Sequence, residues 1–292
     1  MFNPQKISHE YGTNILFKKD NICSRIQYRS TVKYAGLFKD KYPIVHLDKH
    51  DIFINCQELS DYPYILAYEC CKAFYPLVII CNLNGQISGI RTDIIKERWK
   101  TIRNEIEQKF TGKSLTYYLN QTERNIQNDY SIFELIRRDL FFFSYFNLDY
   151  DERKKEIIHE FPAKAFEKPF HGKSHQTIKD FKGKTLIEYN GIMNNCSNQE
   201  NLRNNKINEG EYSIKYTLNN DSVIDAIKLD YKLYEKDTEL PIMETQLQTY
   251  CLRESTIQAI SDIDTINIGK KSLTISPSKH KGFFSLFNIG KS

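Results

Sequence analysis

The hydrophobic period of the chain changes abruptly near residue 91, and this change constrains the fold most. Over residues 15–90, β-branched and aromatic residues alternate with polar ones between turn signals, which is typical of half-buried strands. Over residues 92–112, apolar residues recur at helical spacing up to a glycine stop signal. The pattern predicts an α+β fold in which a helical layer at about residues 92–150 is inserted between two strand-rich halves.

Turn residues refine this prediction within the first half. Asn82-Leu83-Asn84-Gly85 predicts a hairpin between strands at 77–81 and 86–90, because Asn-Gly favours positive φ angles. Residues 61–75, rich in Tyr, Ala and Cys, fit either a strand or a short helix. We also expect strands at residues 24–34 and 43–55, and helices at 92–110, 114–128 and 131–145.

The second half is predicted to be mainly antiparallel β. Asn219-Asn220-Asp221 is typical of a hairpin turn, and a short stretch from Asn84 resembles one from Asn220, which suggests an internal repeat. Strands are expected at 185–189, 211–218, 222–234 and 244–253. Polar residues with Pro162, Pro169 and Gly172 indicate a connector. The expected organisation is residues 1–150, a connector at 151–182, a β region at 183–275 and a flexible tail at 276–292.

Composition limits the functional classes. A formal charge of +4 over 292 residues is too small to favour nucleic-acid binding. We recognise neither a secretory signal nor a run of roughly 18 apolar residues, and the seven cysteines are irregularly spaced, so a cytoplasmic protein without a transmembrane segment is expected. The common phosphate-binding, dinucleotide-binding and metalloprotease motifs are missing from the sequence, so no cofactor is expected.

Two constellations could carry enzymatic chemistry. His46, Asp48 and His50 would project from one face of a strand, where they could ligate a metal ion or act as acid–base groups. A solvated strand face explains the same residues, and we favour it because no fourth ligand can be placed. Asp225, Asp230 and Lys232 could form a nuclease-like acid-and-lysine arrangement, but alternating charge on an exposed strand explains them as well.

The C-terminal tail is the most distinctive segment of the sequence. A basic stretch at residues 276–282 precedes Phe283, Phe284, Leu286 and Phe287. Such an apolar cluster should leave water, either by docking on its own domain, by entering a groove on a protein partner, or by resting on an anionic membrane surface. The many aromatic residues between 117 and 146 could likewise face a partner, an apolar cavity or a large core.

These observations favour a non-catalytic protein-binding, adaptor or assembly protein that uses aromatic surface and the Phe-rich tail. Open alternatives are a carrier whose curved sheet wraps an apolar ligand, and a metal-dependent enzyme of unfamiliar type. A strand-rich half whose hairpin leads into a helix containing Arg98-Trp99 loosely resembles cytoplasmic proteins of contractile injection or type VI secretion systems in Bacteroidetes-like bacteria. The resemblance implies an accessory or structural role in such a bacterial machine.

Overall fold

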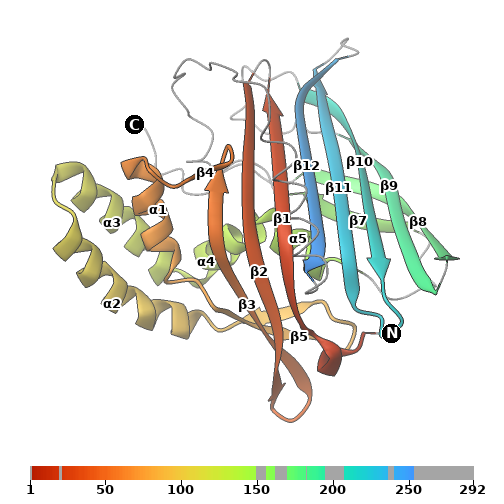
Figure 1. The fold of residues 1–292 in the computed structure, drawn as a ribbon, viewed down its shortest axis with the longest axis horizontal. Coiled ribbons are helices and arrows are strands. Elements are labelled where there is room, and N and C mark those ends of the chain that lie inside the picture. Colours follow the sequence, from red (N-terminus) through yellow and green to blue (C-terminus); the bar gives the residue numbers. More distant parts are fainter. Residues whose placement is uncertain are drawn as a thin grey trace, which may run out of the picture.

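A large, curved antiparallel sheet dominates the fold (Figure 1). The computed structural model describes residues 2–19, 22–148, 156–161, 170–181, 183–194, 207–235 and 240–252. The sheet has twelve strands in the order β6-β5-β3-β2-β1-β12-β11-β10-β9-β8-β7, with β4 paired to β3. The strands are β1 (Ser8–Lys19), β2 (Ile22–Phe38), β3 (Tyr42–Ile54), β4 (Gln57–Glu58), β5 (Leu77–Cys81), β6 (Ile87–Ile90), β7 (Glu156–Phe161), β8 (Phe170–Phe181), β9 (Lys184–Asn194), β10 (Ile207–Leu218), β11 (Ile224–Glu235) and β12 (Pro241–Leu252).

The first strand and the last described strand meet in the middle of this sheet. β1 pairs with β12 in antiparallel register from Glu10 opposite Leu252 to Lys19 opposite Met243. β2 flanks β1 on one side, and β11 flanks β12 on the other. The two strand-rich halves of the chain therefore share a single continuous sheet.

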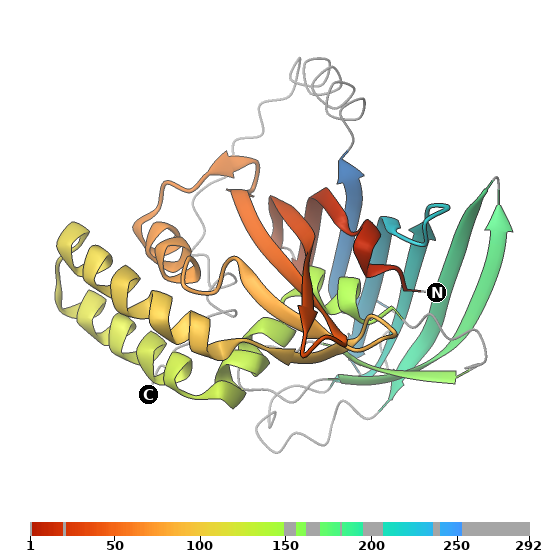
Figure 2. The ribbon, with the colours of Figure 1, turned by 90° about the horizontal axis from the view of Figure 1, so that it is seen from below.

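The helices lie before and within the predicted helical layer. α2 and α3 run side by side next to the β3 side of the sheet, whereas the sheet curves around α5 (Figure 2). No helix among the described residues combines the length and apolar character needed to cross a membrane. The helices are the 3-10 helix η1 (Pro4–Lys6), α1 (Tyr62–Cys71), α2 (Thr92–Lys109), α3 (Lys113–Gln127), α4 (Asp129–Arg137) and α5 (Leu140–Phe146).

Alternation along the strands builds the core on the concave side of the sheet. In β1, Tyr11 and Ile15 are buried while Gly12 and Asn14 between them are partly exposed. The same alternation buries Leu229 on β11 opposite Leu247 on β12. Opposite charges, such as Lys18 and Glu244, pair across strands on the other face. One face of the sheet is therefore apolar and the other is solvated.

The α+β class, both predicted hairpins and the helices at 92–110 and 114–128 are confirmed. The ambiguous segment 61–75 contains helix α1. The helix predicted at 131–145 is instead two helices, because Asp139 has an extended backbone and caps the second of them. The sequence does not reveal this break, because apolar residues continue at helical spacing across Asp139 and no proline interrupts them.

The segment 151–182, expected to be a polar connector, contains strands β7 and β8. The sequence signal was weak because three of the inward positions of β8 are Gly172, Ser174 and Gln176, and only Ile178 among those from 172 to 178 is large and apolar. At Gly172 an added Cβ would lie 2.3 Å from the Tyr212 ring, so the neighbouring tyrosine fills the space that a side chain would take. Backbone pairing with β9 continues through this position.

Candidate functional site

Helix α5 is the element around which the candidate site is built. Its seven residues, Leu-Phe-Phe-Phe-Ser-Tyr-Phe, are all buried, so the helix has no solvent face. At its middle, the Tyr216 hydroxyl donates to the Ser144 carbonyl oxygen at 2.7 Å, which ties the helix to β10. Each end of α5 then meets a different group of side chains from the sheet.

A buried ion pair holds the N-terminal end of α5. The Asp139 side chain accepts a hydrogen bond from the Phe142 backbone N–H at 2.8 Å and pairs with the Lys49 ammonium group of β3. The Lys49 side chain is 6% exposed and that of Asp139 is 15% exposed. Lys49 Nζ also donates to the Tyr28 hydroxyl at 3.3 Å and lies 4.3 Å from the centre of the Tyr28 ring.

The groups around this ion pair are held in their neutral forms. Burial, followed by the Asp139 charge, raises the pKa of Tyr28 and of Tyr75 well above 10.0. Burial raises the pKa of the Cys71 thiol to about 12. At neutral pH these groups therefore keep their protons, and neither the phenols nor the thiol is an activated nucleophile. The arrangement is suited to anchoring α5 on the sheet.

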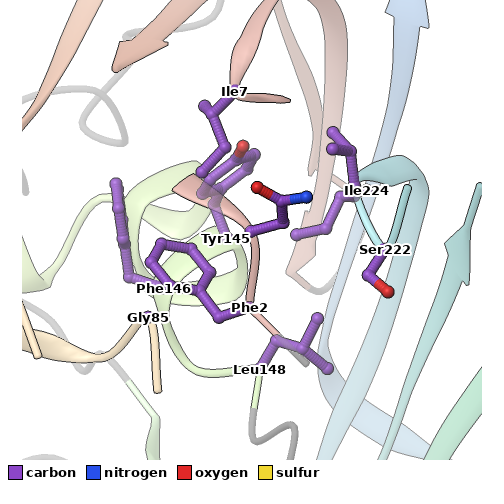
Figure 3. Close-up of a pocket in the computed structure, with 10 residues that line it drawn as sticks. Phe2, Ile7, Gly85, Tyr145, Phe146, Leu148, Ser222 and Ile224 are labelled. Carbon is purple, nitrogen blue, oxygen red and sulfur yellow. The ribbon is translucent and has the colours of Figure 1, made fainter. Parts of the chain in front are cut away.

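The C-terminal end of α5 lines a small pocket (Figure 3). Tyr145 packs edge-on against the Tyr11 ring of β1, with ring centres 5.5 Å apart, and the Tyr11 hydroxyl donates to the Ile224 carbonyl oxygen at 2.9 Å. The remaining space admits about one water molecule. The lining residues are Phe2, Asn3, Ile7, Gly85, Tyr145, Phe146, Leu148, Ser222, Val223 and Ile224.

The N-terminal segment closes this pocket. The Phe2 ring rests on Gly85, where an added Cβ would lie 2.6 Å from the ring, and Gly85 has a φ of +83°. Farther along, Lys6 lies 3.9 Å from Asp221, and the Tyr34 backbone N–H donates to the Ile7 carbonyl oxygen at 2.8 Å. The segment thus runs between the β5–β6 turn and the β10–β11 turn.

These two turns have the same hydrogen-bond pattern. Asn82 Oδ1 accepts from the backbone N–H groups of Asn84 and Gln86, and Asn219 Oδ1 accepts from those of Asp221 and Val223. The position after Asn84 or Asp221 has positive φ in both turns, +83° at Gly85 and +61° at Ser222. The structure therefore aligns Asn84 with Asp221, whereas the internal similarity in the sequence aligned Asn84 with Asn220.

The residues predicted as metal candidates lie at alternating positions of β3, and their charged neighbours come from other elements. Burial and the nearby Arg98 guanidinium lower the pKa of His46, and Asp48 also interacts electrostatically with Arg98. His50 Nε2 on β3 lies 3.2 Å from Glu10 Oε1 on β1, across the intervening strand β2. Within the described part of the chain, no group of three His, Cys, Asp or Glu residues is arranged to hold a metal ion.

Part of the aromatic-rich segment that could face a partner lies inside the protein. Tyr130 is 72% exposed and Tyr117 is 53% exposed, but Phe141, Phe142, Phe143, Tyr145 and Phe146 are buried. The predicted partner-binding residues Phe283, Phe284, Leu286 and Phe287 lie outside the described residues, so their role remains a prediction.

The sequence drew attention to Gly85 as a turn residue but not to the pocket. Phe2 and Asn3 belong to no motif, and nothing in their spacing indicates that they meet α5.

No protein-family model matches the chain, and no curated protein matches it in sequence. A solved structure described as "lipid-protein interactions in lipovitellin" is similar over 87% of this chain and 26% of that chain, with 9% identity and a TM-score of 0.44. This chain thus spans about a quarter of that chain. An N-terminal dehydratase from the difficidin assembly line matches over 88% of this chain and 82% of that chain, with 8% identity and a TM-score of 0.13. With TM-scores this low, neither likeness assigns a fold family or a function to the chain.

Proposed function

We propose that the protein binds a small apolar molecule in the pocket between the C-terminal end of α5, the N-terminal segment and the β5–β6 and β10–β11 turns. The observation that carries this proposal is the lining: seven of its side chains are apolar or aromatic, those of Phe2, Ile7, Tyr145, Phe146, Leu148, Val223 and Ile224. Binding sites for small molecules are typically lined in this way, with a few polar groups. The proposal develops the ligand-carrier alternative from the sequence.

Phe2 occupies the space that a ligand would use. Its ring contacts Gly85, while Ile7 is anchored to β2 by a backbone hydrogen bond. Rotation of the Phe2 side chain away from α5 would join its volume to the remaining space and leave room for an aromatic ring. The ligand must then compensate for the exposed Phe2 ring, whose burial is worth about 1.5–3 kcal/mol.

The test is a calorimetric titration with toluene, a neutral apolar probe with a single aromatic ring, against three forms of the full chain. Phe2→Ala removes the competing ring, so the probe should bind this variant about 10-fold more tightly than the unsubstituted protein. Tyr130→Ala, which removes an exposed aromatic ring outside the pocket lining, serves as the matched control and should bind as the unsubstituted protein does.

The proposal is supported if the probe binds saturably, with the highest affinity for Phe2→Ala and equal affinities for Tyr130→Ala and the unsubstituted protein. An equal affinity for all three forms would place the probe elsewhere on the protein. The absence of saturable binding to Phe2→Ala, in a sample whose circular dichroism matches that of the unsubstituted protein, would rule out a ligand pocket at α5.

A further inference from the structure

Among the described residues, those that line the pocket include no ionisable acid or base other than the Tyr145 phenol. Burial raises the pKa of that phenol, so it stays neutral. The nearest ion pair on the N-terminal segment, Lys6 with Asp221, lies outside the lining, and its side chains are 57% and 56% exposed. A charged ligand group placed in the pocket would lose water without gaining a partner of opposite charge, which is costly.

Two lining residues carry polar side chains in addition to Tyr145, and they come from opposite sides of the pocket. Asn3 belongs to the N-terminal segment, and Ser222 belongs to the β10–β11 turn. Asn3 precedes the 3-10 helix, but its side chain does not cap that helix, and the Lys6 backbone N–H bonds to its backbone carbonyl oxygen instead, at 3.3 Å. A carboxamide provides two donors and one acceptor.

We propose that the pocket selects a neutral aromatic molecule with one hydrogen-bonding group, such as a phenol or an aryl alcohol, and discriminates against aromatic and fatty carboxylates. This inference rests on the proposed function and adds the ligand class. The apolar ring takes the place of Phe2 beside Phe146, and the Asn3 carboxamide binds the hydroxyl group. The hydrogen bond from the Lys6 N–H to the Asn3 carbonyl oxygen restrains the Asn3 backbone when the Phe2 side chain rotates.

The test uses three probes that share a single aromatic ring: benzene, phenol and benzoate, titrated by calorimetry into the full chain at neutral pH. One hydrogen bond should make phenol bind about 3- to 10-fold more tightly than benzene. Benzoate should bind at least about 10-fold more weakly than phenol, because its charge is not compensated.

Asn3→Leu keeps the approximate size of the side chain and removes the carboxamide, so the preference for phenol over benzene should disappear. Asn84→Leu makes the same change on an exposed turn residue outside the lining and should leave the preference intact. The probe series in the unsubstituted protein is informative even if a variant folds poorly.

The outcomes separate the ligand class from the proposed function. If benzene and phenol bind equally well, or if Asn3→Leu keeps the preference, the pocket binds apolar molecules but the inferred selection is wrong. If benzoate binds most tightly, the inference is also wrong, and a cationic group such as Lys6 recognises the ligand. If none of the three binds to Phe2→Ala either, the proposed function itself fails.

Discussion

The charges of Lys49 and Asp139 are both buried, and each is compensated by the other. Replacing Lys49 by Met leaves the Asp139 carboxylate buried without its partner, which should lower the free energy of unfolding by about 3–5 kcal/mol in urea titrations. Adding Asp139→Asn removes the orphaned charge and retains a side chain that can cap α5, so the double variant should recover much of this loss. Lys18→Met, which breaks an exposed pair with Glu244, is the control and should cost under about 1 kcal/mol.

Tyr28 and Tyr75, beside the Lys49–Asp139 ion pair, should make the free energy of unfolding fall at alkaline pH. Because the folded-state pKa values of Tyr28 and Tyr75 lie well above 10.0, their stabilising contribution is complete below about pH 10 and is lost as the pH rises further. The free energy of unfolding should fall by about 1.4 kcal/mol per pH unit for each tyrosine above that pH. Tyr28→Phe should make the decline shallower; an unchanged slope would contradict the assignment.

Helix α5 shows what a local sequence pattern can and cannot predict. The periodic helices α2 and α3 were predictable because each has one apolar face, whereas α5 is buried all round and its boundary with α4 is set by one capping residue, Asp139. Strand β8 was missed since most of its inward residues, Gly172, Ser174 and Gln176, are small or polar. The pocket could not be predicted at all, because Phe2, Gly85, Phe146 and Ser222 meet only through the tertiary fold.

The packing of α5 gives a prediction for the whole helix. Phe142 is 1% exposed, and replacing it by Ala should lower the free energy of unfolding by about 3–5 kcal/mol, because the removed ring leaves a cavity. Tyr130→Ala on the exposed side of α4 should change it by less than about 0.5 kcal/mol. Chemical denaturation followed by circular dichroism measures both values. Similar losses in the two variants would argue against α5 as the centre of the core.

The continuous sheet predicts that the two halves of the chain unfold together. Trp99, the single tryptophan, reports on the helix layer of the first half, while far-ultraviolet circular dichroism reports on all strands. Because β1 and β12 join the halves, both signals should change at the same denaturant concentration. Two separate transitions would indicate that the halves are independent domains.

The pairing of β1 with β12 also determines when the fold can be completed during synthesis. Thr13 and Thr249 are hydrogen-bonded partners separated by 236 positions, so β1 leaves the ribosome long before its neighbour is made. Until then β1 can pair only with β2, and its other edge is open to strands of other chains. We infer that the nascent protein is most prone to aggregation just before β12 emerges, and that slow translation across residues 195–240 prolongs this exposure.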